Sequence, residues 1–526
     1  MRVRCLTAVT LIALASSGCT QTPPEPPKLV VMVVVDQLRA DLLERYDDAF
    51  TGGFRRLIDG GAVFTQASHR HASNSTAIGH ATLSTGVFPT RHGIVGNSWE
   101  EQLEDGTFRS VYSVEDTLSP LIGFPTAGGR SPKNIMRTGL ADWMQEQDPR
   151  TRVVSISGKD RGAIPMAAQS RGHVYWVVGS AGRFATSSYY RTSYPAWVER
   201  FNREAMPRIM GEPVWESEVP EPFNSLARPD QAPYEGDGEH TTFPHVRADE
   251  SPGDSPRAQY SWSAGQPPID RAVLEFTAAA MAEFSLGQEE QQDFLAVSFS
   301  ATDYVGHSYG PLSQEQFDNI LRLDVVLGEL MDLLDERVGE GRWVLGLSAD
   351  HGVVTMPEWL AQNGEPGYRT TQEDLTFMAS VVERVQGEMA SATEEDRLAA
   401  IAVALETEID WIADVMLPSE LMNPSPDSMI NLHANSWNPD RRHGLLPELG
   451  LYVRTTEGTL ASNRPQGTAH GTPYWYDRHV PLILYGAQVT PGRYADEVYT
   501  VDLAPSLAAL AGTTTPTDLD GRSVVR

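Results

Sequence analysis

Cysteine is nearly absent from this chain. Only Cys5 and Cys19 occur among its 526 residues, which excludes a disulfide framework, a cysteine-based zinc site and an iron–sulfur cluster. The sequence also lacks a glycine-rich phosphate loop of the Walker type, a His-Glu-x-x-His zinc helix and internal repeats. Any tight metal site must therefore be built from His, Asp and Glu side chains.

Basic residues are also scarce. The chain holds 41 Lys+Arg against 70 Asp+Glu, a formal net charge of −29. A stable nucleic-acid partner would require the opposite balance, because Lys and Arg hold phosphate backbones. The acidic excess favours solubility and suits a protein that binds cations. Hydrophobic residues make up 40% and charged residues 21%, which is typical of a globular protein.

Long apolar runs are missing beyond the N-terminus. Leu6–Ala15 is apolar and follows Arg2 and Arg4, but it is too short to span a membrane. The small residues before Cys19 resemble a bacterial lipoprotein box, with ordinary secretory cleavage nearby as the alternative. We predict a signal peptide at residues 1–18 and a proline-rich spacer at 19–28. The protein is then exported to the periplasm of a bacterium or anchored in its outer membrane as a lipoprotein.

Short apolar runs alternate with helical patterns along the rest of the chain. Leu29–Val35 is apolar on both faces, which is typical of a buried parallel strand, and a helical pattern follows from Asp41 to Ile58. This rhythm predicts an α/β domain over 29–526, with a mostly parallel central sheet flanked by helices. Cap insertions are predicted at about 165–285 and 356–440. Further strand-like runs are Arg152–Ser157, Phe294–Ser300, Trp343–Leu347 and Val480–Tyr485, and further helical patterns are Gln314–Arg337 and Leu503–Leu510.

Acidic and histidine residues stand at or near the ends of several predicted strands. Each alone is compatible with a surface turn or a helix cap. Together, three Asp and three His suit two zinc-like cations, because zinc takes nitrogen and oxygen ligands and open α/β sheets place their sites past the carboxyl ends of strands. The six residues are Asp36, Asp303, His307, Asp350, His351 and His470.

Two further motifs suit a phosphoryl group. Thr76 opens a helical run, where a hydroxyl serves either as an N-cap or as a nucleophile beside amides that attract an anion. Lys159 and Arg161 follow a predicted strand and can converge on one anion, with a solvated loop as the alternative. Asn97, in a Gly-Ile-Val-Gly-Asn turn, can donate a neutral hydrogen bond there.

The order of these motifs resembles the alkaline phosphatase superfamily, and within it the PafA/PhoK-type bacterial alkaline phosphatases with a threonine nucleophile. The resemblance runs over nearly the whole mature chain. It implies one zinc held by Asp303, His307 and His470, and two Zn²⁺ per chain, with a further structural cation such as Ca²⁺ as an option. The other zinc would be held by Asp36, Asp350, His351 and the Thr76 oxygen.

The resemblance also implies a reaction. Thr76 would attack phosphorus to form a phosphothreonine, while Lys159, Arg161 and Asn97 hold the non-bridging oxygens. Small phosphate monoesters are the expected substrates, and a monomer the expected state. The alternatives are a phosphodiesterase or nucleotide pyrophosphatase of the same superfamily and a non-catalytic envelope binding protein. A sulfatase is disfavoured because Thr76 stands where those enzymes need a modified Cys or Ser.

Overall fold

The structure is a computed structural model that describes residues 25–236, 238–247, 256–425 and 428–526. The predicted signal peptide, Cys19 and most of the proline-rich spacer lie outside the described residues, so the export and lipid-anchor predictions stay predictions. Within the described part of the chain, no helix has both the length and the apolar character needed to cross a membrane.

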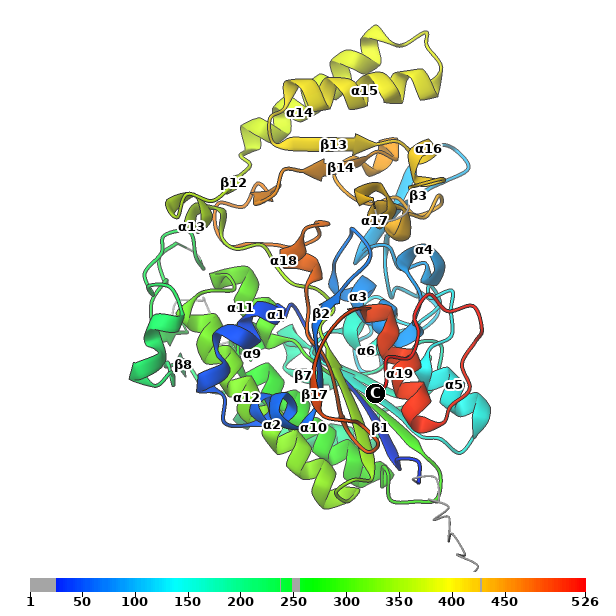
Figure 1. The fold of residues 1–526 in the computed structure, drawn as a ribbon, viewed down its shortest axis with the longest axis vertical. Helices are drawn as coiled ribbons and strands as arrows, with labels where there is room; N and C mark the ends of the chain where they lie inside the picture. Colours follow the sequence, from blue (N-terminus) through cyan, green and yellow to red (C-terminus); the bar gives the residue numbers. More distant parts are fainter. Residues whose placement is uncertain (1–24, 237, 248–255, 426–427) are drawn as a thin grey trace, which may run out of the picture.

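A nine-stranded sheet forms the centre of the molecule (Figure 1), in the order β17-β2-β16-β11-β1-β10-β5-β6-β7. Strands β11, β1, β10, β5 and β6 run parallel, whereas β16 and β7 run antiparallel to their neighbours. The predicted mostly parallel sheet is therefore confirmed. The strands are β1 Leu29–Val35, β2 Ala62–Ser68, β5 Val153–Ser157, β6 His173–Val178, β7 Arg183–Ala185, β10 Asp293–Phe299, β11 Trp343–Ser348, β16 Leu482–Gly486 and β17 Gly492–Tyr499.

Strand β1 lies in the middle of this sheet and is buried along its whole length. Val31 and Val33 point into one hydrophobic core and Met32 and Val34 into a second, because successive side chains of a strand alternate between faces. Helices therefore cover both faces, as predicted. The first core is covered by α1 Ala40–Arg45, α2 Gly53–Gly60, α10 Pro268–Phe284 and α12 Gln314–Arg337, and the second by α3 Thr76–Thr85, α5 Leu140–Gln147, α6 Asp160–Met166 and α19 Leu503–Ala511.

The segment predicted as the first insertion, 165–285, contributes to the central sheet as well as to its surroundings. It supplies edge strands β6 and β7, and α10 packs its Phe276 against Phe184 of β7 at a centroid distance of 3.8 Å. The other elements of this segment are α7 Ala196–Glu204, α8 Met206–Ile209, β8 Val214–Trp215, β9 His245–Val246 and α9 Pro256–Ala264.

The segment predicted as the second insertion, 356–440, forms a layer of its own above α3 and α18 in Figure 1. We call residues 357–460 the cap layer, because β14 and β15 continue it beyond residue 440 by pairing with β13 and β12. It has a separate hydrophobic core between α14 and α15. Its elements are α13 Pro357–Gln362, β12 Tyr368–Arg369, α14 Gln372–Glu388, α15 Glu394–Glu408, β13 Ile412–Met416, α16 Pro418–Leu421, α17 Met429–Ser436, β14 Tyr452–Thr455 and β15 Thr459–Leu460.

Short connecting elements complete the described fold. They are α4 Pro89–His92, β3 Ser98–Gln102, β4 Phe108–Tyr112, α11 Ala301–Tyr309 and α18 Trp475–Arg478. The hairpin β3–β4 follows the loop that holds Asn97, and α11 directly follows β10.

Candidate active site

Three neighbouring parallel strands are each followed by a carboxylate at the same edge of the sheet. Asp36 follows β1, Asp303 lies in the first turn of α11 after β10, and Asp350 follows β11. These strands are adjacent in the order β11-β1-β10, so their carboxyl ends meet. All three carboxylates are buried, with at most 2% of each residue exposed.

The six predicted ligands gather into two sets of three. Asp303, His307 and His470 form one set, and the other contains Asp36 with its two neighbours past β11. In each set the potential ligand atoms lie within 4.8 Å of one another. The rings of His351 and His470 stack at a centroid distance of 3.6 Å, so the two sets adjoin. The second set is Asp36, Asp350 and His351.

The hydrogen bonds of the three histidines leave one ring nitrogen of each directed toward carboxylates. The Nδ1 of His307 contacts the Thr468 carbonyl at 2.7 Å, and the Nδ1 of His470 contacts the Asn74 carbonyl at 2.7 Å. His351 pairs its Nδ1 with the Gly352 carbonyl at 2.9 Å. A carbonyl only accepts, so each Nδ1 donates a proton to it and each Nε2 is the ring atom that faces the carboxylates, the orientation found in metal-ligating histidines.

The Nε2 atoms face the carboxylates at short range. His307 Nε2 lies 3.2 Å and His470 Nε2 3.7 Å from Asp303 Oδ1, and His351 Nε2 lies 3.6 Å from Asp36 Oδ1. Burial alone would lower the pKa of His307, but the charge of Asp303 and a hydrogen bond to it raise this pKa.

Two buried atoms of the ligand sets, Asp36 Oδ1 and His351 Nε2, lack a hydrogen-bond partner among the described residues. A buried acceptor without a partner costs free energy. Divalent cations would satisfy these atoms, so the donor set fits metal ions that accept nitrogen and oxygen ligands.

Burial and neighbouring charges shift the pKa values of the candidate ligands. Burial and the neighbouring His351 and His307 lower the pKa of His470 well below its ordinary value, so this imidazole is neutral. Burial alone would raise the pKa of Asp303, but His307 and Lys159 hold it well below its ordinary value. Burial and the negative charge of Asp350 raise the pKa of Asp36. Three carboxylates in close proximity favour a further cation at this site.

Lys159 lies between the two ligand sets. Its Nζ is 2.6 Å from Asp36 Oδ2 and also contacts Asp303 Oδ2. The ammonium sits 4.7 Å from the centre of the Tyr304 ring, and only 2% of the residue is exposed. The alternative of a solvated loop lysine is therefore wrong.

Arg161 lies on the first turn of α6, two residues from Lys159. Its Nε is buried without a hydrogen-bond partner among the described residues. The neighbouring Asp160 is engaged elsewhere, because it accepts from Tyr112 Oη at 2.6 Å and from Arg130 Nε at 2.6 Å. Asp160 therefore anchors the start of α6, whereas Arg161 retains a buried donor near the site.

Thr76 is the first residue of α3, with 1% of it exposed. The N-cap position belongs to Ser75, whose side chain makes no capping hydrogen bond, so the N-cap alternative for Thr76 is wrong. Asn97 Oδ1 accepts the Ala77 N–H at 2.9 Å. That contact holds the Asn97 amide at the N-terminus of α3 and leaves its NH₂ group free to donate.

His80 joins α3 to the second ligand set. Its Nδ1 lies 2.8 Å from the Thr76 carbonyl and 3.2 Å from Asp350 Oδ2, and its Nε2 lies 2.9 Å from Ser298 Oγ. The first turn of the helix that carries Thr76 therefore lies against a candidate metal-ligand carboxylate.

Sequence reasoning missed Gln37. This residue has a φ of 68°, which is rare for a residue with a side chain. Its backbone N–H donates to Asp350 Oδ1 at 3.0 Å, and its Nε2 donates to Asp303 Oδ1 at 2.7 Å. Gln37 thus holds one carboxylate of each set. Its place directly after Asp36 is the only sequence signal for this role.

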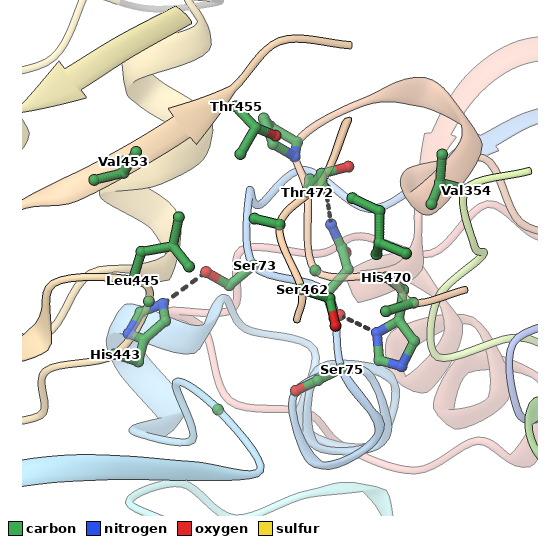
Figure 2. A pocket seen from close by; sticks show the side chains of 18 of the residues that line it. Ser73, Ser75, Val354, His443, Leu445, Val453, Thr455, Ser462, His470 and Thr472 are labelled. Atoms are coloured by element: carbon green, nitrogen blue, oxygen red, sulfur yellow. Dashed lines mark hydrogen bonds between the residues drawn. The ribbon is translucent and has the colours of Figure 1, made fainter. Parts of the chain in front are cut away.

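An open pocket of about 670 Å³ leads from these residues to the cap layer. Asn97, His307 and His470 line its inner side, and the opposite side is lined by residues 443–445, 452–455, 459–462, 464 and 466. Figure 2 shows His470 and His443 on opposite sides of the pocket, with Ser73 and Ser75 between them. The cap layer therefore forms the outer wall of the candidate active site.

Comparisons with known proteins agree with this geometry. Residues 30–406 match the family described as type I phosphodiesterase / nucleotide pyrophosphatase. The chain is 32% identical over 524 residues to alkaline phosphatase PhoV of Synechococcus elongatus, covering 95% of this chain and 92% of PhoV. It is 27% identical to alkaline phosphatase PafA of Elizabethkingia meningoseptica over 98% of this chain and 97% of PafA. The crystal structure of PafA superimposes with a TM-score of 0.85 at 26% identity, covering 95% and 98% of the two chains.

Proposed function

The chain belongs to the type I phosphodiesterase / nucleotide pyrophosphatase family of the alkaline phosphatase superfamily and is an alkaline phosphatase-like hydrolase of phosphate esters; from this premise we propose that it hydrolyses phosphate monoesters through a covalent phosphothreonine at Thr76. The observation that carries the proposal is the contact between α3 and the second ligand set, in which His80 from the first turns meets Asp350. A helix N-terminus with a hydroxyl nucleophile thus lies beside a cluster of metal-ligating side chains.

Two Zn²⁺ ions, one in each ligand set, fit the donors described above, and when bound they would neutralise charge on the entering and leaving oxygens. Three imidazole nitrogens and three carboxylates support zinc over magnesium or calcium, which prefer oxygen ligands alone. A further structural cation and a monomeric state stay predictions.

The side chains of the chain itself account for the rest of the reaction. The Thr76 Oγ attacks phosphorus and loses its proton, the ester oxygen leaves as an alcohol after taking up a proton, and water then hydrolyses the threonine phosphate to release inorganic phosphate. The backbone N–H groups at the start of α3 favour the arriving anion. Asn97, Lys159 and Arg161 donate to the non-bridging oxygens, where charge is spread in the transition state.

Phosphodiester hydrolysis is the second candidate, because the matched family is named for it. Both reactions would use the same ligand sets and Thr76. The buried cations distinguish them. Lys159 and the unpartnered Arg161 donor offer two positive charges, which suit a monoester dianion with three non-bridging oxygens better than a diester monoanion.

The test is Thr76→Ala, which should lose most monoesterase activity while the metal content stays that of the wild type. Labelled phosphate trapped on the wild type at low pH should map to the peptide containing Thr76. Ser75→Ala is the matched control, since this neighbouring hydroxyl makes no capping hydrogen bond, and it should keep its activity. A label on another residue, or a fully active Thr76→Ala variant, would refute the proposed nucleophile.

A further inference from the structure

The walls of the pocket differ in charge from the rest of the molecule. The chain carries 70 Asp+Glu against 41 Lys+Arg, yet among the described residues no Asp or Glu lines this pocket. The outer wall instead holds arginine and histidine side chains from the cap layer and the loop after it, namely His433, His443, Arg454 and Arg464. In so acidic a protein, a pocket wall free of carboxylates points to an anionic occupant.

His433 contributes a buried polar group without a partner. It lies on α17 with 6% of the residue exposed, and neither ring nitrogen has a hydrogen-bond partner among the described residues. Burial and the neighbouring Arg454 and His443 lower its pKa to about 3. The ring is therefore neutral and keeps one N–H donor that a ligand in the pocket would satisfy.

Arg454 is incompletely compensated. On β14, its Nη1 donates to Tyr474 Oη at 3.2 Å, and its Nη2 lies 3.4 Å from Asp414 Oδ2, a carboxylate that is 32% exposed and lies outside the pocket lining. Its Nε is buried without a hydrogen-bond partner among the described residues. A single long contact to a solvated carboxylate stabilises a half-buried guanidinium weakly.

The same pocket reaches the candidate active site, since Asn97, His307 and His470 line it. Ser73, three residues before Thr76, contacts His443 Nε2 through its Oγ at 2.6 Å (Figure 2). Asn97 and His307 line the inner side and Arg464, which is exposed, lines the outer side of one cavity. A phosphoryl group held beside Thr76 therefore leaves the rest of the substrate in reach of the outer wall.

We propose that His433, Arg454 and Arg464 form a second anion subsite that binds a phosphate or carboxylate group on the leaving group of the substrate. The inference rests on the proposed function and narrows it to phosphate monoesters that carry a second anionic group. An arginine fork and an imidazole N–H match the oxygens of either group.

A matched series of open-chain hexitol esters tests this. Sorbitol 6-phosphate has a neutral leaving group, 6-phosphogluconate adds a carboxylate at the far end, and sorbitol 1,6-bisphosphate adds a phosphate. We expect kcat/KM to be about tenfold higher for an anionic member than for sorbitol 6-phosphate, as one charge-assisted hydrogen bond would give. The two anionic members distinguish a carboxylate subsite from a phosphate subsite. Equal kcat/KM for all three would overturn the proposal.

Variants of the outer wall test which residues cause the preference for anionic substrates. Arg464→Gln and Arg454→Gln should each reduce the preference for the anionic members while p-nitrophenyl phosphate turnover stays near that of the wild type. Arg454→Lys, which keeps the charge, should restore part of the preference and guards against a folding defect. Arg397→Gln on α15 removes the same charge outside the pocket. An equal loss of preference in this control would mean that net charge, and not the subsite, causes the preference for anionic substrates, and it would refute the proposal.

Direct binding separates this inference from the proposed reaction. Calorimetry with Thr76→Ala, loaded with zinc, should show tighter binding of sorbitol 1,6-bisphosphate than of sorbitol 6-phosphate, with the difference reduced by Arg464→Gln. That result supports the subsite even if the wild type proves inactive on monoesters. Equal affinities refute the subsite even if Thr76 is shown to be the nucleophile.

Discussion

Single residues decide the chemistry of this site through the direction of their lone pairs. His307, His351 and His470 each direct Nδ1 to a backbone carbonyl, so each Nε2 faces the candidate metal site. The carbonyl partners lie at Thr468, Gly352 and Asn74, only one of them next in sequence to the histidine it orients. The tautomer of each ligand is thus set by neighbours that the ligand motif does not contain.

Replacing Lys159 and Arg161 by Ala should damage monoester turnover more than diester turnover. Loss of about 3 kcal/mol of transition-state stabilisation corresponds to roughly a hundredfold in rate, and a diester places less charge on the same oxygens. The double variant should shift the ratio of kcat/KM toward bis-p-nitrophenyl phosphate by about tenfold.

The control for this experiment is Lys133→Ala, an exposed lysine. Metal content must be measured in parallel because Lys159 contacts a carboxylate of each ligand set. Equal losses on both ester classes would mean that the pair supports the metal site or the fold rather than the monoester.

Asp142 should make stability depend on pH. Burial raises its pKa to about 6, although its carboxylate accepts from the Gly139 N–H at 2.8 Å and the Gln169 N–H at 3.1 Å. The unfolded chain releases this proton near pH 4 and the native chain near pH 6. Its contribution to stability is therefore full below about pH 4 and falls by about 3 kcal/mol as pH rises to about 6.

Asp142→Asn removes this titration. The free energy of unfolding of the variant relative to the wild type should increase between pH 4 and pH 6 and stay constant above, as measured by denaturant unfolding at several pH values. A difference that does not change with pH would contradict the shifted pKa.

At the scale of elements, tertiary contacts decide where helices begin and how closely they approach the sheet. The pattern from Asp41 to Ile58 predicts one helical segment, but the structure has α1 and α2 with a break between them. Asp324 of α12 holds the start of α2, because its carboxylate accepts the N–H groups of Thr51, Gly52 and Phe54 at 2.7–2.8 Å. A carboxylate about 270 residues away thus caps α2.

Gly79→Ala tests the approach of α3 to the sheet. A Cβ atom at Gly79 would lie 2.0 Å from the Asp350 carbonyl oxygen, so the helix must move away from a ligand strand. We expect a loss of at least about 1–3 kcal/mol of stability and a loss of activity, measured by denaturant unfolding and p-nitrophenyl phosphate turnover.

Gly387→Ala in α14 is the matched control, since nothing lies within 4 Å of the added Cβ. Helix propensity alone should make this variant about 0.5–1 kcal/mol more stable. If Gly79→Ala behaves like Gly387→Ala, the packing of α3 against β11 does not position the site.

At the scale of the whole molecule, the two ligand sets join segments that are far apart in the chain. Asp36, Asp303 and Asp350 come from three strand ends, and His470 comes from the loop that follows the cap layer. Metal ions bound at these side chains would cross-link the sheet, α11 and that loop. Stability of the molecule should therefore depend on the metal.

Chelation should lower the unfolding temperature of the wild type, and zinc should restore it. A site occupied at a thousandfold excess over its Kd adds about 4 kcal/mol. Asp350→Asn should bind fewer zinc ions by elemental analysis and respond less to the chelator. A wild type whose unfolding temperature does not respond to chelation would contradict a metal-linked fold.

The sequence by itself determined the α/β class, the central strand Leu29–Val35 and the six candidate ligands, because buried parallel strands leave continuous apolar runs and their carboxyl ends meet at one edge. It also marked Thr76, Lys159 and Arg161 as candidates. The sheet order, the extent of the cap layer and the role of Gln37 were decided only by the tertiary structure.

The outer wall of the pocket shows most clearly why some features depend on the tertiary structure. His433, Arg454 and Arg464 have no spacing that relates them to Thr76, and each is ordinary in its local sequence. They acquire a common environment only when β14 pairs with β13 and the cap layer folds over α3. Local patterns report which face of an element is buried, whereas contacts between elements hundreds of residues apart depend on how the faces pack.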